Sequence, residues 1–142
     1  VSLTDNAPVS TVSLNTRWRR NLQNSDALSF GINVRRAKSD DFDSDYTSIN
    51  YRAFYNFSES FAGMRFGFGL DAETRDFDAT RFLRSGTRAD KSIELNMSAT
   101  FTNWEFYGFR PVLNAQMKRN HSNVDRFDRD FISMGFDLRS SF

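Results

Sequence analysis

Asp41, Asp43 and Asp45 alternate along one short stretch of this 142-residue chain, and their carboxylates are the first candidates for chemistry. Spaced carboxylates can supply the hard oxygen ligands that Ca²⁺ prefers. A calcium loop, however, needs glycine where this chain has Tyr46, and no glutamate closes the site at the required offset. The sequence therefore predicts a solvated acidic loop, with no resident metal and no other cofactor.

His121 and Ser122 are the second candidates, because a serine and a histidine together can hydrolyse a lipid ester. Such a pair works only when the nucleophile and the base lie within hydrogen-bond reach. Adjacent residues of a strand point to opposite faces, and no carboxylate at a fixed spacing orients this single histidine. We therefore predict a hairpin loop in which Ser122 and Asn123 satisfy the turn backbone, in a protein that is not an enzyme. An outer-membrane lipid hydrolase remains an alternative.

The composition restricts the class of protein that could position these residues. The net charge is +1 and there is no cysteine, so nothing favours a nucleic-acid partner, and disulfides and cysteine-ligated zinc are excluded. There is no run of about 18 apolar residues, as a transmembrane helix would need. Sixteen phenylalanines in a chain with a mean hydropathy of −0.59 are unusual, and they are typical of strands with one apolar and one polar face.

Strict alternation of apolar and polar residues is clearest near the C-terminus. Ile132, Met134 and Phe136 share one parity there, while Ser133 and Gly135 share the other. The same alternation predicts about seven strands, at 12–19, 28–35, 48–57, 64–73, 92–101, 109–118 and 132–142. Each is close to the roughly 9–11 residues with which a tilted strand crosses a bilayer.

Alternation alone fits both a soluble β-fold and a membrane barrel, but three features favour the barrel. Glycines occur in mid-strand on the polar parity. Short connections (23–26, 58–63 and 103–108) alternate with longer and more charged ones (37–45, 76–90 and 120–128). Aromatic residues gather beside the short turns, as in an interfacial girdle. We therefore predict an all-β, antiparallel transmembrane β-barrel of up-and-down meander strands, in contact with the lipids of the bacterial outer membrane and spanning residues 1–142.

The residues on the polar parity are predicted to line the lumen of this barrel, and basic residues outnumber acidic ones among them. Its charged residues are Arg17, Arg19, Arg35, Arg52, Arg65, Asp71, Glu73, Glu94, Arg110, Lys118, Asp137 and Arg139. These charges could steer anions, or they could pair across strands and hold the wall together. On the other parity, Met134, Phe136, Leu138 and Phe142 are expected to face lipid, and the barrel assembly machinery could recognise this final strand.

The strand count has a consequence for the number of strands in the whole barrel. If Phe142 lies on the periplasmic side, seven strands place Ser10 on the outer side, whereas single-chain bacterial barrels normally have an even strand number. We therefore expect these residues to be the C-terminal part of a larger barrel, with an upstream part of the same barrel as their partner. Alternatively, residues 1–9 contribute to an eighth strand of a small closed barrel.

Three segments near the end of the chain resemble a known family. They are Gly108-Phe109-Arg110-Pro111-Val112-Leu113, Arg119-Asn120-His121-Ser122-Asn123 and the run from Phe127-Asp128-Arg129-Asp130 through Ser133-Met134-Gly135-Phe136 to Phe142. They resemble the C-terminal barrel region of the surface lipoprotein assembly modifier family. The resemblance implies a translocon component that assists surface delivery of lipoproteins, with a lipoprotein cargo as partner. A porin-like channel for small anionic solutes is the other non-enzymatic alternative.

Overall fold

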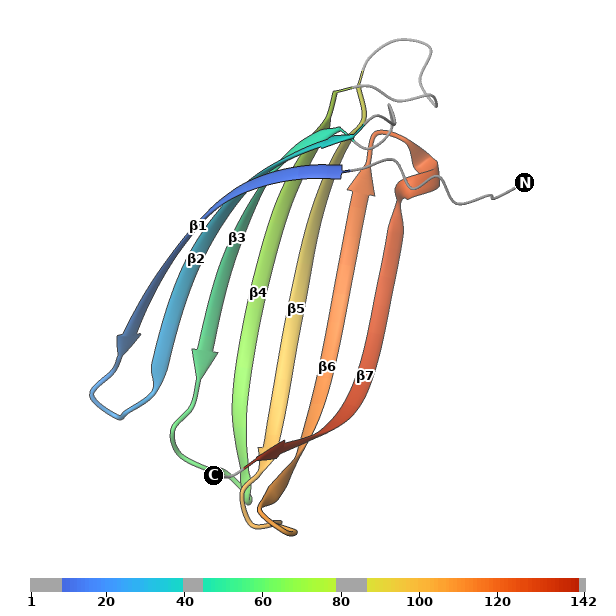
Figure 1. The fold of residues 1–142 in the computed structure, drawn as a ribbon. Coiled ribbons are helices and arrows are strands. Elements are labelled where there is room, and N and C mark those ends of the chain that lie inside the picture. The colour runs from blue at the N-terminus through green and yellow to red at the C-terminus, as the bar shows by residue number, and fades with distance from the viewer. Residues whose placement is uncertain (1–8, 40–44, 79–86, 141–142) are drawn as a thin grey trace.

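The computed structural model describes residues 9–39, 45–78 and 87–140, which form one antiparallel sheet (Figure 1). Its seven strands lie in the order of the sequence, with one short 3₁₀ helix, η1 (Asp125–Phe127), before the last. The strands are β1 (Val9–Asn21), β2 (Ala27–Ser39), β3 (Tyr46–Asn56), β4 (Met64–Phe77), β5 (Ala89–Phe101), β6 (Phe109–Ser122) and β7 (Arg129–Ser140). The predicted all-β meander of seven strands is confirmed.

The sheet is open in the structure. β1 pairs with β2 alone and β7 pairs with β6 alone, so both outer strands have a free edge. Closure into a barrel therefore stays a prediction. No helix in the described residues is long and apolar enough to span a membrane.

Two of the short connections are tight turns of the same kind. Bridges between Phe61 and Met64 and between Phe106 and Phe109 close them. The two central residues of each turn have positive φ angles, 52° and 75° in the first turn and 50° and 77° in the second. This is the backbone of a type I′ turn, whose twist matches that of the strands it joins. Gly63 and Gly108 supply the second position, where the left-handed conformation is least costly for glycine.

Burial is confined to one face of the sheet. All buried strand residues of the described chain lie on the polar parity, and they are Ala27, Ala37, Ser48, Gly67, Gly69, Phe77, Asp90, Val112 and Ser122. On the other face large apolar side chains stand exposed, with exposed fractions of 70% at Leu14, 51% at Leu95 and 77% at Met134. A soluble sandwich would cover that face with a second sheet. In the described parts of the chain no second layer covers it.

Candidate functional site

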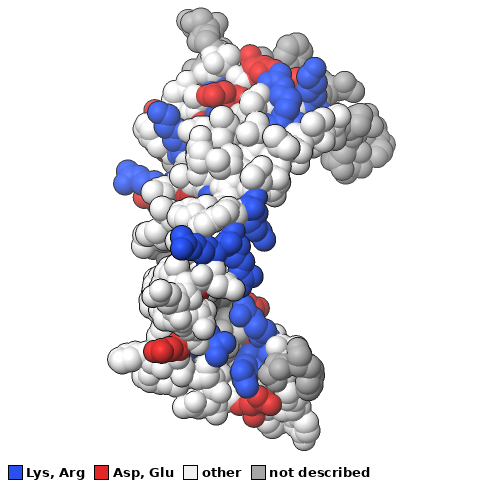
Figure 2. Space-filling view, turned by 90° about the vertical axis from the view of Figure 1, so that its left-hand side faces the viewer, with Lys and Arg blue, Asp and Glu red and all other residues white. Residues whose placement is uncertain are grey.

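The charged residues predicted to line a lumen all lie on one face of the sheet. The register ensures this, because residues that pair across antiparallel strands point to the same side. One row of paired residues crosses six strands and reads Arg17, Gly31, Arg52, Asp71, Glu94 and Lys118. In Figure 2, which faces the β1 side, the molecule is hollowed on one side and lysine and arginine side chains form a band along the hollow. That this face lines a lumen stays a prediction.

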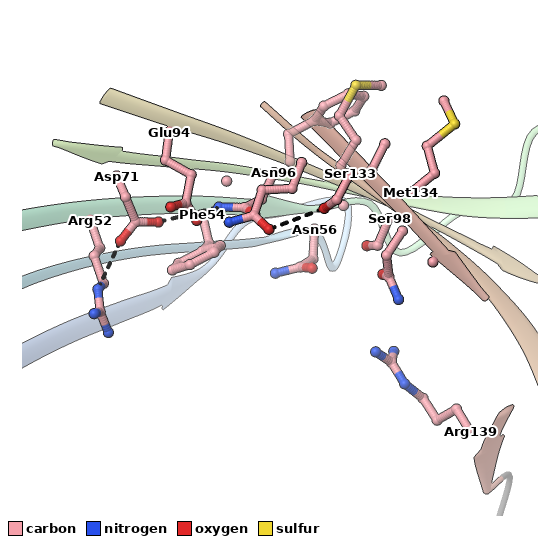
Figure 3. A pocket seen from close by; sticks show the side chains of 18 residues that line it. Arg52, Phe54, Asn56, Asp71, Glu94, Asn96, Ser98, Ser133, Met134 and Arg139 are labelled. Carbon is pink, nitrogen blue, oxygen red and sulfur yellow. Dashed lines mark hydrogen bonds and ion pairs between the residues drawn. The ribbon is translucent and has the colours of Figure 1, made fainter. Parts of the chain in front are cut away.

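A pocket of about 600 Å³ lies on this face, over β3 to β7. Arg52 and Asp71 lie at one end of it, and Asn96 and Ser133 lie along its floor (Figure 3). Arg139 reaches in from β7 on the far side. The pocket is therefore polar. The Arg52–Asp71 ion pair lies at one end, Arg139 lies at the other, and neutral hydrogen-bonding side chains lie between them.

Two carboxylates in the pocket are directly opposite each other, an arrangement that is normally destabilising. Asp71 on β4 pairs in register with Glu94 on β5. Each has a cation of its own: Arg52 Nε lies 2.8 Å from Asp71 Oδ1, and Lys118 Nζ lies 3.4 Å from Glu94 Oε2. The Asn96 amide donates to Glu94 at 3.0 Å and to Asp71 at 3.5 Å, so it joins the two pairs into one network.

Phe54 breaks the alternation of β3, and the structure explains why. Its ring covers the backbone of Gly69, directly opposite on β4, where a Cβ atom would lie 2.5 Å from Phe54 Cε1. The side chain of Asn56 covers Gly67 in the same way, with its Oδ1 2.8 Å from the position of such a Cβ atom. The mid-strand glycines of β4 thus make room for neighbours across the strand, which are an aromatic ring and an amide.

His121 and Ser122 do not form a catalytic pair in the structure. The Ser122 side chain points to the polar face and the residue is 3% exposed, whereas the His121 side chain is 75% exposed and lies 3.3 Å from Asp128. Ser122 Oγ accepts a hydrogen bond from the Val124 N–H at 3.2 Å. Asn123 ties this loop to the β4–β5 connection and the start of β5, because its Oδ1 accepts from the Ala89 N–H and its Nδ2 donates to the Thr87 carbonyl, both at 2.8 Å. Ser122 thus satisfies a backbone group of its own loop, as the sequence predicts, whereas the backbone partners of Asn123 belong to the β4–β5 connection and the start of β5.

An arginine at the long-loop end of the sheet was not singled out from the sequence. The Arg88 guanidinium lies between two aromatic rings, 4.1 Å from the centroid of Phe77 and 3.4 Å from that of Phe127, and it forms a bidentate ion pair with Asp90. Arg88 and Asp90 have side chains only 14% and 7% exposed. This cluster fastens the β4–β5 connection to the segment before β7.

A buried aspartate ties the short turns together at the other end of the sheet. Asp26 is 2% exposed and accepts hydrogen bonds from the Tyr55 hydroxyl at 2.5 Å, the Ser58 N–H at 2.7 Å and the Asn24 amide at 2.6 Å. These hydrogen bonds, led by that of Tyr55, stabilise the carboxylate and lower the pKa of Asp26 to about 2. The β1–β2 turn is thereby fixed to the start of the β3–β4 connection.

The remaining predicted residues are placed as follows. Asp41, Asp43 and Phe142 lie outside the described residues, and the backbone carbonyl of Asp45 accepts from the Asp78 N–H at 3.1 Å. Within the described ranges no group of three potential metal ligands occurs. Met134, Phe136 and Leu138 are exposed on the apolar face, with exposed fractions of 63% or more.

Comparison with known proteins gives one family match. The family model described as "Surface lipoprotein assembly modifier" matches residues 6–133, which is most of the chain. No curated protein and no solved structure gives a significant match. The matched region includes β1 to β6, so it extends far beyond the terminal segments that carried the resemblance in the sequence. This chain belongs to the surface lipoprotein assembly modifier family.

Proposed function

We propose that this sheet is part of the wall of an outer-membrane β-barrel that assists the delivery of lipoproteins to the cell surface. Membership of the family supports the link to lipoprotein assembly. The observation that carries the membrane assignment is the distribution of burial. Every buried strand residue of the described chain lies on the polar face, and each of the seven strands has at least one large exposed apolar side chain on the other face. In water that exposure would be costly, whereas in a bilayer lipid tails cover it.

The free edges of the sheet indicate how it would be completed. A strand in lipid must pair all of its backbone groups, so an open edge does not persist in the hydrocarbon region. β1 and β7 run in the same direction, because neighbouring strands alternate and six antiparallel pairs separate them. Direct closure would make a parallel pair, so antiparallel closure needs an odd number of further strands. We propose that these strands come from another part of the same barrel.

Cysteine labelling tests which face of the sheet meets lipid. Residues 1–142 contain no native cysteine that would compete with an introduced one. Leu95→Cys on the apolar face and Ser98→Cys on the polar face of β5 are introduced separately into the full-length protein in outer membranes. A water-soluble maleimide is expected to label the cysteine at position 98 and to leave that at position 95 unmodified. A lipid-soluble maleimide should give the opposite result. Equal labelling of both positions by the water-soluble reagent would refute the membrane assignment.

Lipoprotein delivery is tested in cells. Protease accessibility of a surface lipoprotein is compared between cells with and without the full-length protein, at equal lipoprotein synthesis. We expect surface exposure to fall when the protein is absent, while total lipoprotein is unchanged. If surface exposure of the lipoprotein were unchanged, the delivery role would be refuted. The barrel assignment would then still be tested separately by the cysteine labelling.

A porin-like channel for small anions is the second candidate, and one observation favours it. Arg17 and Arg19 project from β1 onto the polar face, and within the described residues neither makes an ion pair. A basic lumen raises the local concentration of anions. Equal anion and cation permeability of the full-length protein in a planar bilayer would exclude this candidate.

A further inference from the structure

The polar face divides into two sectors that differ in charge pairing. On β3 to β6, Arg52, Arg75 and Lys118 contact carboxylates, as Arg52 does with Asp71 at 2.8 Å, and Arg65 on β4 is an exception among the described residues. On β1, Arg17 and Arg19 point to the same face, and no carboxylate in the described parts of the chain forms an ion pair with either guanidinium. The β1 sector therefore presents two uncompensated positive charges, both on side chains of exposed residues.

Gly31 on β2 lies directly between Arg17 and Arg52 in one row of the register. A Cβ atom at Gly31 would meet only the Thr16 carbonyl oxygen, at 3.4 Å. The space above it is unfilled, unlike the space above Gly69, which the ring of Phe54 occupies. Glycine within a strand weakens the sheet and often marks a place where a ligand approaches the backbone. Gly31 thus leaves a hollow between two arginines.

The spacing of the strands lets three arginines converge over this hollow. Two strand spacings separate Arg17 from Arg52, so their Cα atoms are about 10 Å apart. Arg19 follows Arg17 on the same face, about 7 Å further along β1. Arg52 binds Asp71 through Nε, and its other two guanidinium nitrogens are turned away from that carboxylate (Figure 3).

We propose that Arg17, Arg19 and Arg52 bind a phosphate group above Gly31. Arginine presents several N–H donors in a planar fork that matches phosphate oxygens. Asp71 compensates the charge of Arg52, so Arg17 and Arg19 leave two positive charges for the ligand. Two charges match the dianion of a phosphate monoester better than a single carboxylate. This site goes beyond the proposed function, and it concerns either a free phosphorylated solute or a phosphate-bearing lipid headgroup.

Isothermal titration of the full-length protein in detergent micelles tests the site. Inorganic phosphate is the first probe, and glycerol phosphate and a short-chain phosphatidic acid then distinguish the soluble source from the lipid source. We expect the combined change Arg17→Gln and Arg19→Gln to weaken phosphate binding by roughly tenfold or more. Gly31→Val keeps every charge but fills the hollow with a residue that favours strands, and it should weaken binding to a similar extent.

Arg65→Gln is the matched control, because it removes one charge from the same face of β4 at a distance from Gly31. Phosphate affinity should change by less than about twofold in this variant. A loss of phosphate affinity as large as that of the Arg17→Gln and Arg19→Gln double variant would overturn the site. It would indicate that binding depends only on the total charge of this face. The site would also be overturned if the unchanged protein bound no phosphate and the Arg17→Gln and Arg19→Gln double variant had a lower unfolding temperature. That result would mean that carboxylates of a neighbouring strand occupy the arginines. The cysteine-labelling result is independent of either outcome.

Discussion

Replacing Gly69 by alanine is predicted to have opposite effects on stability with and without Phe54. In the unchanged protein, the new Cβ atom would lie 2.5 Å from Phe54 Cε1 and 3.3 Å from Asn96 Cβ. Forcing the ring away is a small-to-large change in a packed site and costs about 1–3 kcal/mol. Alanine also restricts the unfolded chain, which gains about 0.5–1 kcal/mol at a strand position with ordinary φ. We expect a net loss of about 1 kcal/mol, near the middle of the range that these two terms leave.

In a Phe54→Ala background the clash with the ring is absent and only Asn96 Cβ, at 3.3 Å, lies close to the new Cβ atom, so Gly69→Ala should raise the free energy of unfolding by up to about 0.5–1 kcal/mol. The two changes are therefore coupled by roughly 1–3 kcal/mol, as expected for residues in direct contact. The four proteins of this cycle are unfolded from detergent micelles in guanidinium, and loss of β-sheet is followed by circular dichroism.

Gly31→Ala serves as the control for this cycle, because its Cβ atom has only one neighbour, the Thr16 carbonyl oxygen at 3.4 Å. Its effect should be the same in both backgrounds. Gly69→Ala could instead change stability with the same sign and size whether or not Phe54 is present. The position of the Phe54 ring would then not require a glycine at position 69. The explanation for the aromatic exception on the polar face would then be wrong.

Three further predictions concern the two ends of the sheet. The pKa of Asp26 is lowered from 3.8 to about 2, so its contribution to stability is complete above pH 3.8 and is lost as the pH falls towards 2; Asp26→Asn should remove this part of the acid dependence in thermal unfolding. Arg88→Met leaves the Asp90 carboxylate buried without its cation and should cost about 3 kcal/mol, measured by chemical unfolding, whereas a smaller loss is expected when Asp90→Asn is added. Ser122→Ala removes the hydrogen bond from the Val124 N–H and should cost about 1 kcal/mol, while any hydrolysis of lipid esters by the purified protein should be unchanged.

The strands and their two faces could be predicted because both depend on neighbouring residues along the chain. Side chains alternate with a period of two, so a run such as Ile93, Leu95 and Met97 reveals its face without any knowledge of its partner strand. The antiparallel order follows from short connections between consecutive strands. Strand ends were less visible, since the alternation predicted 64–73 and β4 continues to Phe77.

The contacts that fix the ends of the sheet could not be predicted, because they join residues far apart in the sequence. Tyr55 reaches Asp26 across 29 positions, and Phe127 lies against Arg88 although a whole hairpin separates them. None of these residues stands in a motif that identifies its partner. Phe54 illustrates the same limit, since its placement depends on a glycine in the next strand and on the register that brings the two together.

The height of the apolar face supports the proposal that lipid covers it. On β3 to β6 the apolar row covers the same length of strand, at 49–57, 64–72, 93–101 and 109–117. That length is about 26 Å at 3.3 Å per residue, or about 20 Å along the membrane normal for a strand tilted by about 40°. Charged residues on the same face, among them Lys91 and Arg119, lie beyond the upper end of the row. A second protein layer would follow the outline of its own side chains, whereas a bilayer imposes one height on every strand. Apolar rows of equal length, with charged residues only beyond them, are expected where the hydrocarbon layer of a membrane, slightly thicker than about 20 Å, covers these strands.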